Sequence, residues 1–235
     1  MKVSGFVCVV MVLIAGASTG WGQASTSHVF PQVVDGTLDG STYLSLLSIA
    51  NFNTGSANCN LGLAGMGADR WAGSLTPTLS GYYTIMNATR GQGGFQSGFA
   101  ELNCTQPVQA SLTYIQIGAD GHTASMATVF SAPRVGYASL PVLAGLGFRY
   151  ALALVNPGTV PISVEVSLER TSGSQTTKLQ VPARTRLVRF ADELLTVPSA
   201  PEFDLLEVTS SSKFHVTALL YSEGKFTTLI PATTP

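Results

Sequence analysis

The sequence predicts an all-β protein with two tandem antiparallel β-sandwich domains after a signal peptide. Beyond residue 24, the chain divides into short segments in which apolar and polar residues alternate, which is typical of half-buried β-strands. Turn residues separate these segments about every 8–12 positions, as in known β-sandwiches. Two pairs of segments also recur at a nearly constant offset, which indicates two copies of one domain.

The first 24 residues are expected to form a secretory signal peptide. Lys2 precedes an apolar run from Phe6 to Ala15, and Gly22 with Ala24 fits the small-x-small rule for signal cleavage. The run is too short to cross a bilayer as a helix, and no later stretch is suited to do so. We therefore expect a mature chain without a transmembrane helix that is secreted, periplasmic or at the cell surface.

The internal repeat is carried by two pairs of segments. Glu101–Gln116 and Glu207–Ser222 share their leading glutamate and six apolar positions at an offset of 106 residues. Ser45–Asn51 and Tyr150–Asn156 align at an offset of 105 residues. In each member of the first pair, a short strand, a polar turn and a longer strand follow one another, which predicts a β-hairpin.

Ser131–Arg134 is the expected connection between the two copies. It places the first domain at residues 25–133 and the second at residues 134–235. Because the connection has few residues, the two domains are expected to lie against each other.

Each copy contains about seven expected strands, as a small sandwich requires. In the first copy they are His28–Val34, Tyr43–Asn51, Cys59–Ala64, Gly81–Asn87, Phe99–Cys104, Val108–Ile117 and His122–Phe130. In the second they are Tyr137–Leu143, Phe148–Asn156, Ile162–Arg170, Leu179–Val181, Arg186–Phe190, Phe203–Thr209, Phe214–Tyr221 and Lys225–Ile230. Ala191–Leu195 is the one expected helical turn, and Arg90–Gly94 is expected to be a flexible loop.

Charge is sparse and balanced, with 12 basic and 13 acidic residues in the whole chain. Binding to nucleic acid or to an anionic membrane surface calls for a basic excess, so we expect neither partner.

Two cysteines, Cys59 and Cys104, remain after removal of the signal. An even number in an exported chain predicts a disulfide between them. Two buried free thiols are the alternative.

The chain offers no pattern for catalysis or for a metal centre. Beyond the expected signal peptide it has no Gly-x-Ser-x-Gly elbow, and it has no Cys-x-x-Cys and no His-x-x-x-His. His28, His122 and His215 are scattered singly, and His215 is expected to be a solvated strand residue. We therefore expect a protein that is not an enzyme and that binds no cofactor and no metal.

Two acidic patterns invite functional interpretations. Asp35 and Asp39 resemble part of a calcium loop, but such a loop needs more oxygen ligands, and two consecutive turns explain the same residues. Glu101 and Glu207 recur at equivalent positions, yet a glycosidase pair must lie within about 5–10 Å in one cleft. We favour structural roles for all four residues.

Trp71, Tyr82 and Tyr83 are the candidate ligand-binding residues. They lie in or beside the irregular part of the first copy, and aromatic rings on sandwich loops can stack on sugars or anchor protein partners. The alternative is that Trp71 covers a sheet edge and that one tyrosine of the pair points into the core.

Three short motifs, Phe30–Gly36, Asn156–Gly158 and Phe190–Leu194, resemble those of a group of poorly characterised exported bacterial proteins. This resemblance implies tandem immunoglobulin-like β-sandwich domains and export, and it implies no catalytic residue. The second copy departs from the pattern, because Leu140–Val142 stands where the first copy has Phe-Pro-Gln. The first copy lacks the Phe-x-x-Glu-Leu turn.

The expected function is a non-enzymatic structural or interaction module that meets a protein or glycan partner at the cell surface or outside it. Adhesion and assembly are its expected activities. A carbohydrate-binding module that uses Trp71, Tyr82 and Tyr83 is the alternative. Exposed sheet edges also predict self-assembly by strand addition, with the extended segment Ser25–Val34 as the donor.

Overall fold

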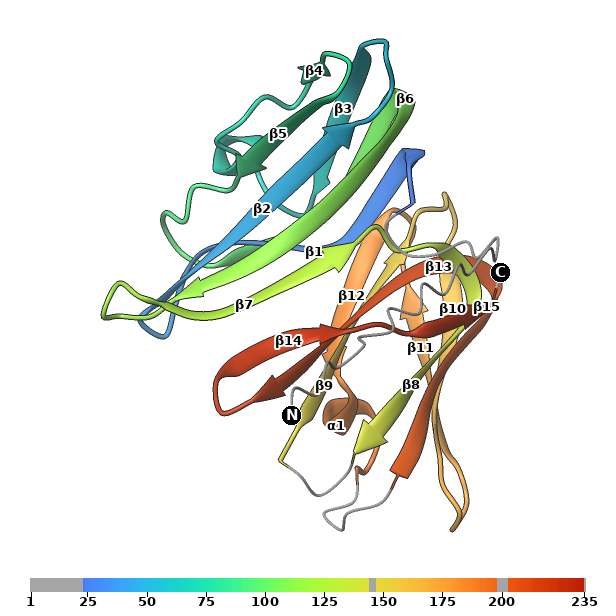
Figure 1. The fold of residues 1–235 in the computed structure, drawn as a ribbon. Coiled ribbons are helices and arrows are strands. Elements are labelled where there is room, and N and C mark those ends of the chain that lie inside the picture. Colours follow the sequence, from blue (N-terminus) through green and yellow to red (C-terminus); the bar gives the residue numbers. More distant parts are fainter. Residues whose placement is uncertain (1–22, 144–146, 198–202, 235) are drawn as a thin grey trace, which may run out of the picture.

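The computed structural model describes residues 23–143, 147–197 and 203–234 of the chain. Within these ranges almost all regular structure is β-strand in antiparallel sheets, so the all-β prediction is confirmed. The expected signal peptide lies outside the described residues, apart from its last two positions. Figure 1 shows two bodies, one sheet formed before residue 131 and another formed after residue 133.

The first sheet has seven strands in the order β4-β3-β6-β1-β2-β5, and β7 also pairs with β6. Its strands are β1 (Ser25–Leu38), β2 (Ser41–Asn51), β3 (Ala57–Ala64), β4 (Thr78–Leu79), β5 (Tyr83–Ala88), β6 (Gln96–Ile117) and β7 (Thr123–Phe130). A short 3-10 helix, η1 (Ala68–Arg70), lies between β3 and β4.

The second sheet has eight strands, with β11-β10-β13-β8-β15 in order, β9 and β14 paired with β13, and β12 paired with β9. Its elements are β8 (Arg134–Leu143), β9 (Arg149–Asn156), β10 (Ile162–Glu169), β11 (Gln175–Val181), β12 (Thr185–Phe190), the one-turn helix α1 (Ala191–Leu194), β13 (Phe203–Ser222), β14 (Lys225–Leu229) and β15 (Ala232–Thr234).

Each sheet contains one long strand, β6 or β13, where the sequence predicts a hairpin. The hairpin prediction is wrong because the two halves of each long strand pair with other strands and not with each other. In β6, Leu102 of the first half lies opposite Leu61 of β3, and Leu112 of the second half lies opposite Leu47 of β2. Apart from Phe99, the buried residues on both sides of Pro107 occupy even positions, so one alternation runs through the polar middle.

Each sheet encloses its own hydrophobic core. The fully or almost fully buried side chains of the first core include Phe30, Leu47, Leu61, Leu102 and Leu112. Those of the second core include Leu140, Leu154, Val166, Leu206 and Phe214. Each such side chain contributes about 1.5–3 kcal/mol through burial, so the two cores are the main source of stability.

The strands of the two sheets pair in the same pattern. β6 pairs with β1, β2, β3 and β7, and β13 pairs with β8, β9, β10 and β14, in the same order along the chain. β2 also pairs with β5 as β9 pairs with β12, and β3 pairs with β4 as β10 pairs with β11.

One buried asparagine ends the second strand of each series, Asn51 in β2 and Asn156 in β9. The Nδ2 group of Asn51 donates to the carbonyl oxygens of Gly55, Leu79 and Ser80 at 2.8, 3.3 and 3.0 Å. That of Asn156 donates to the carbonyl oxygens of Val160, Val181 and Pro182 at 2.8, 3.0 and 3.1 Å. Each Oδ1 accepts the backbone N–H two residues further on. Each amide therefore ties a turn and a neighbouring strand to the end of its own strand.

The two sheets lie directly against each other, as the short connection predicts. Phe226, Leu219 and Ala151 of the second sheet join the first core. At the contact of β7 with β14, the Ser125 hydroxyl donates to the carbonyl of Phe226 and accepts its N–H, both at 2.9 Å. This interface is packed and hydrogen-bonded, so the sheets are held in one orientation.

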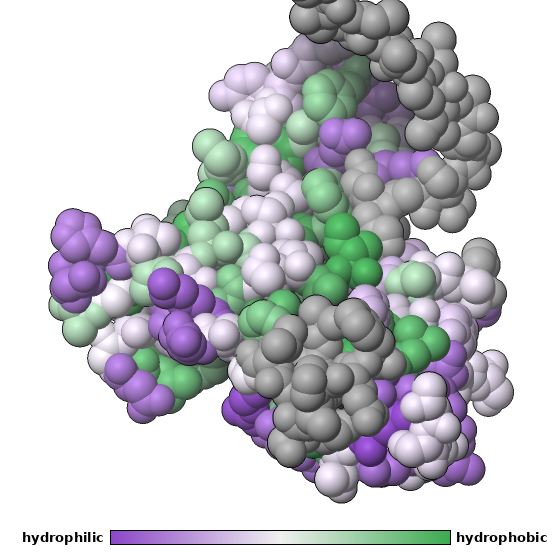
Figure 2. Space-filling model, turned by 60° about the horizontal axis from the view of Figure 1, so that its bottom comes forward, coloured by the Kyte–Doolittle hydropathy of each residue, from purple (hydrophilic) through white to green (hydrophobic). Residues whose placement is uncertain are grey.

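Figure 2 shows one face of the molecule, on which hydrophobic side chains lie in small patches among hydrophilic ones. Within the described ranges, no helix combines the length and the apolar character needed to span a membrane.

Candidate functional site

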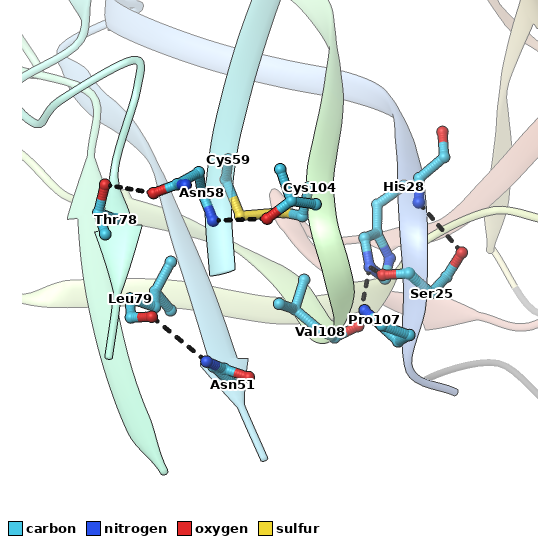
Figure 3. Close-up of a disulfide and its surroundings, with 12 residues drawn as sticks. Ser25, His28, Asn51, Asn58, Cys59, Thr78, Leu79, Cys104, Pro107 and Val108 are labelled. Carbon is cyan, nitrogen blue, oxygen red and sulfur yellow. Dashed lines mark hydrogen bonds between the residues drawn. A yellow bond between two sulfur atoms is a disulfide. The ribbon is translucent and has the colours of Figure 1, made fainter. Parts of the chain in front are cut away.

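Cys59 in β3 and Cys104 in β6 lie opposite each other and are joined by a disulfide, with an S–S distance of 2.04 Å (Figure 3). Cys59 is only 5% exposed and belongs to the first core. The bond joins two strands that already pair, so it reinforces the sheet. Its burial argues for a structural role.

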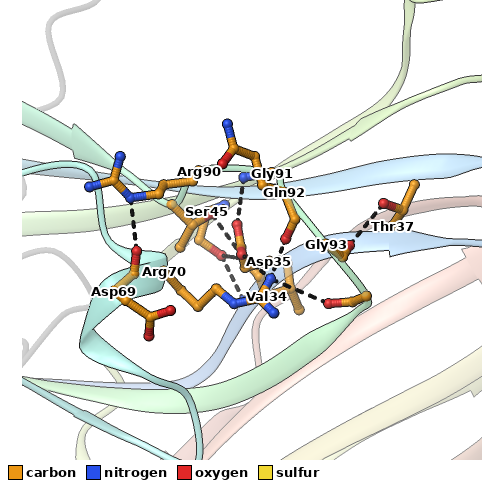
Figure 4. A network of polar contacts seen from close by, with 12 residues as sticks. Val34, Asp35, Thr37, Ser45, Asp69, Arg70, Arg90, Gly91, Gln92 and Gly93 are labelled. Carbon is orange, nitrogen blue, oxygen red and sulfur yellow. Dashed lines mark hydrogen bonds and ion pairs between the residues drawn. The ribbon is translucent and has the colours of Figure 1, made fainter.

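Asp35, at the end of the part of β1 that pairs with β6, is fully buried and holds a polar network (Figure 4). Its Oδ2 lies 3.2 Å from Nη1 of Arg70, and its Oδ1 accepts the N–H of Gly91 at 2.6 Å. Arg70 also donates to the carbonyl of Gln92. Residues 90–94, which the sequence predicts to be flexible, are therefore anchored at several points.

The backbone at Gly36 also depends on this loop. A Cβ atom at Gly36, whose φ is 95°, would lie 2.4 Å from the carbonyl oxygen of Gly94, so only glycine allows the approach.

The structure favours turns over calcium binding for Asp35 and Asp39. The Asp35 carboxylate is occupied by an arginine and a backbone N–H, and Asp39 is an exposed turn residue with a φ of 50°. No group of three or more His, Cys, Asp or Glu side chains that could hold a metal ion occurs in the part of the chain described.

Glu101 and Glu207 are in different sheets and have different neighbours. The carboxylate of Glu207 accepts the hydroxyl of Tyr137 at 2.6 Å, and this hydrogen bond raises the pKa of that hydroxyl. Glu101 lies instead in a groove between the sheets. The structure therefore does not bring the two carboxylates into one cleft.

The three aromatic candidates separate into two groups. Trp71 is 3% exposed and packs in the first core, so it presents no ring face to a ligand. Tyr82 and Tyr83 are 72% and 56% exposed at the start of β5. Phe52, which the sequence analysis did not select, is 61% exposed and follows the residue that pairs with Tyr83. We call Phe52, Tyr82 and Tyr83 the aromatic edge.

Tyr82 has a φ of 56°, in the left-handed region that a bulky side chain rarely adopts. Its N–H donates to the carbonyl of Asn53 at 3.2 Å, which joins this residue to the loop that follows β2. A glycine or asparagine would fit this position with less strain, and strained residues of this kind cluster at functional sites. The presence of a tyrosine at this position therefore favours a role for its ring other than stabilising the fold.

Replacing Tyr82 by glycine is expected to raise the free energy of unfolding by about 0.5–1 kcal/mol, because relief of the left-handed strain exceeds the added flexibility of the unfolded chain. Urea unfolding measures this change. Tyr83→Gly is the matched control: it lies in β5 with an ordinary strand conformation, so the same substitution should destabilise. Equal destabilisation by both variants would show that Tyr82 is not strained.

His28 and His215 are buried, at 1% and 8% exposure. The ring of His28 donates from Nε2 to the carbonyl oxygens of Ser25 and Val108 at 3.0 and 2.9 Å. Nδ1 of His215 donates to the carbonyl oxygen of Ala132 at 2.8 Å. The prediction of a solvated His215 is wrong because the connection between the sheets covers the polar face of β13. Desolvation by burial lowers the pKa of both rings.

These lowered pKa values make stability depend on pH. Below the ordinary histidine pKa of about 6.5, the two rings bind protons in the unfolded chain more readily than in the folded chain. Protonation therefore favours the unfolded chain. Stability is therefore expected to be constant above about pH 7 and to fall as the pH drops from about 6.5 to 5, by about 1 kcal/mol or more. Urea unfolding across this range checks the prediction. His28→Gln and His215→Gln should each reduce the slope, and an unchanged slope in both variants would contradict the prediction.

Three adjoining hollows of about 490, 330 and 400 Å³ form what we call the intersheet groove. The first and second share Glu101 and Pro157, and the second and third share Ala64, Phe99 and Arg184. The first sheet supplies Ser27, His28, Val29, Gly62, Ala64, Ser97, Phe99, Glu101 and Asn103 among others. The connection and the second sheet supply residues that include Arg134, Pro157, Arg184, Arg186, Arg189 and His215.

Comparisons of the chain with protein-family models, curated proteins and solved structures find no match. The aromatic edge and the intersheet groove are therefore the features from which a function is inferred.

Sequence reasoning did not select Phe52 or the arginines of the groove. Arg184, Arg186 and Arg189 stand close together in the sequence and were a visible signal. Only the packing of the two sheets places Arg134 and Glu101 along the same groove as these arginines.

Proposed function

We propose that this protein is an exported, non-enzymatic interaction module of two tandem immunoglobulin-like β-sandwich domains that assembles with a second copy through β5. The proposed domains are residues 25–133 and 134–235, after a signal peptide at residues 1–24. The observation that carries the proposal is the exposed, uncharged edge of β5 beside the aromatic edge. The disulfide and the signal pattern favour a place outside the cell, in a periplasm or at the cell surface.

The matched strand pairing of the two sheets supports the two-domain part of the proposal. Two unrelated sheets have no physical reason to share an order of pairing along the chain. Asn51 and Asn156 add an independent likeness, because each bonds three carbonyl oxygens at the same place in its series.

The backbone of β5 offers hydrogen-bonding groups to another strand. Thr89 donates its N–H to the carbonyl of Ser45 at 2.9 Å, which fixes the alternation of inward and outward groups along the antiparallel pair. Thr84 and Met86 consequently direct their N–H and C=O groups away from β2. β5 ends the strand order, so no further strand among the described residues pairs with these groups.

From Tyr83 to Met86 the β5 edge lacks the features that normally prevent pairing, whereas the carbonyl of Ala88 already accepts the N–H of Ala72 at 2.8 Å. Residues 83–88 contain no charged residue and no proline, and Met86 is 67% exposed. A second copy is the favoured partner because two such strands pair antiparallel about a two-fold axis without opposing like charges. Strand donation by Ser25–Val34 is the less favoured route, since β1 pairs with β6 of its own chain along this segment.

Sedimentation velocity over a range of concentrations tests the proposal. The native chain is expected to dimerise, and Met86→Lys, which places a positive charge on each of the two pairing strands, should remain monomeric. Met126→Lys is the matched control, because Met126 is 62% exposed on β7 and away from β5. A native chain that is monomeric at all concentrations, or equal loss in both variants, would refute assembly through β5.

Carbohydrate binding is the second candidate function, and the exposure of Tyr82 and Tyr83 favours it. Exposed rings stack on the apolar faces of sugars. A glycan array should then give signals that Tyr82→Ala and Tyr83→Ala abolish. Trp71→Ala is unsuitable as a binding test, because the buried ring belongs to the core and its removal would destabilise the fold.

A further inference from the structure

The intersheet groove concentrates positive charge in a chain that has little charge elsewhere. Arg134 lines its first hollow, Arg184 lines the second and third, and Arg186 and Arg189 line the third. Glu101 is the acidic residue among its lining side chains. With both lining histidines neutral, the groove therefore carries a clear positive excess.

These four arginines have no carboxylate partner among the described residues. The ion pairs within the described ranges use Arg70, Arg149, Arg170 and Lys178, all outside the groove. Within these ranges the partly buried Arg70 and Arg170 have a carboxylate partner, whereas the partly buried Arg186 and the exposed Arg134, Arg184 and Arg189 have none. Guanidinium groups that line a hollow without a carboxylate partner favour the binding of an anion that is not part of the chain.

Arg186 is the most informative of the four. It is partly buried, and among the described residues its guanidinium donates to two neutral groups, the side chains of Gln32 and Ser97. Burial lowers the pKa of this guanidinium, which reflects the cost of placing a charge there without a counter-ion. An anion in the third hollow would offset that cost.

Arg184 has a φ of 52°, so its backbone is in the left-handed region. It is exposed and lines two adjoining hollows. Glycine or asparagine would adopt this backbone conformation with less strain. The presence of an arginine here therefore favours a role for its side chain in the groove.

We propose that the intersheet groove binds an acidic peptide segment in an extended conformation. The three hollows adjoin in a row, which suits a chain that presents carboxylates at intervals. Their partly exposed apolar lining, with Pro157, Leu187 and Val188, suits the intervening side chains. An acidic polysaccharide is disfavoured because Phe99 is only 5% exposed and presents no open ring face for stacking.

This site goes beyond assembly through β5 and does not depend on it, because the two surfaces share no residue. Fluorescence anisotropy with a labelled oligoglutamate peptide tests the proposal on the full mature chain. The native protein is expected to bind the peptide, with an affinity that falls as salt rises and that far exceeds the affinity for free glutamate. The triple variant R134Q/R184Q/R189Q should lose about tenfold or more in affinity.

The matched control is R90Q/K213Q/K225Q, which removes the same charge at exposed positions that do not line the groove. It should bind within about twofold of the native protein, apart from the small effect of net charge. E101Q should bind more tightly, because it removes the acid from the groove. This gain in affinity keeps the test valid even if the arginine variant folds poorly.

Three results would overturn the proposal. The first is a native protein that does not bind the peptide. The second is an equal loss in the groove variant and in the control, which would indicate general attraction of charge. The third is groove-dependent binding of polygalacturonate without binding of oligoglutamate, which would assign the groove to an acidic polysaccharide.

Discussion

Asp35→Ala is expected to lower the free energy of unfolding by about 3–5 kcal/mol, the range for breaking one side of a buried ion pair. The carboxylate is fully buried, and the side chain of Arg70 is 18% exposed, so the arginine is left in the protein without its counter-ion. The N–H of Gly91 loses its acceptor as well. Urea unfolding of the native chain and of the variant measures the loss.

Asp192→Ala is the matched control for this prediction. It breaks the pair of Arg149 with Asp192, whose side chains are 48% and 41% exposed, and it should cost about 0–1 kcal/mol. The double variant Asp35→Ala/Arg70→Met should recover part of the loss, because it removes the stranded charge. If Asp35→Ala cost no more than Asp192→Ala, the Asp35 network would not be a source of stability.

Removal of the disulfide by Cys59→Ala/Cys104→Ala is expected to cost about 4 kcal/mol. The bond closes a loop with a sequence separation of 45 residues. Without the bond the unfolded chain has a higher conformational entropy, which favours unfolding. Thermal unfolding should show a decrease in Tm of about 10 °C for a chain of this length.

Reductant supplies the control for the disulfide prediction. It should lower the Tm of the native chain toward that of the double alanine variant and should leave the variant unchanged. A native chain whose Tm does not respond to reduction under unfolding conditions would contradict the prediction.

The strands were predictable from the sequence because their cause is local. Alternation of apolar and polar residues is a property of a few neighbouring positions, and it located β2 and β3 to within two residues at each end. The alignment of Asn51 with Asn156 was also visible, and the structure gives both residues the same set of acceptors.

The pairing of the strands was less predictable. The sequence analysis joined Phe99–Cys104 and Val108–Ile117 as a hairpin, because a polar stretch between two strands usually marks a turn. In the structure each half of β6 has partners that are distant in the sequence, and the polar stretch is where the strand passes from one set of partners to the other. Local pattern specifies a strand but does not specify its neighbour.

Exposure at the candidate sites depended on packing between the sheets. Trp71 and His215 were both assigned to solvent or to an edge, and both are buried. In the second case the covering group is the carbonyl of Ala132, which reaches the ring only because the two sheets abut. The alternation of apolar and polar residues within β13 cannot predict that contact.

The sequence by itself determined the all-β character, the positions of most strands and the cysteines available for a disulfide, because alternation, turn chemistry and residue type act over short distances. Only the tertiary structure decided which strands pair, which aromatic rings reach solvent, and that four arginines line one groove. Those outcomes depend on contacts between residues far apart in the chain, and the free energy of such contacts is set by the packing of the whole molecule.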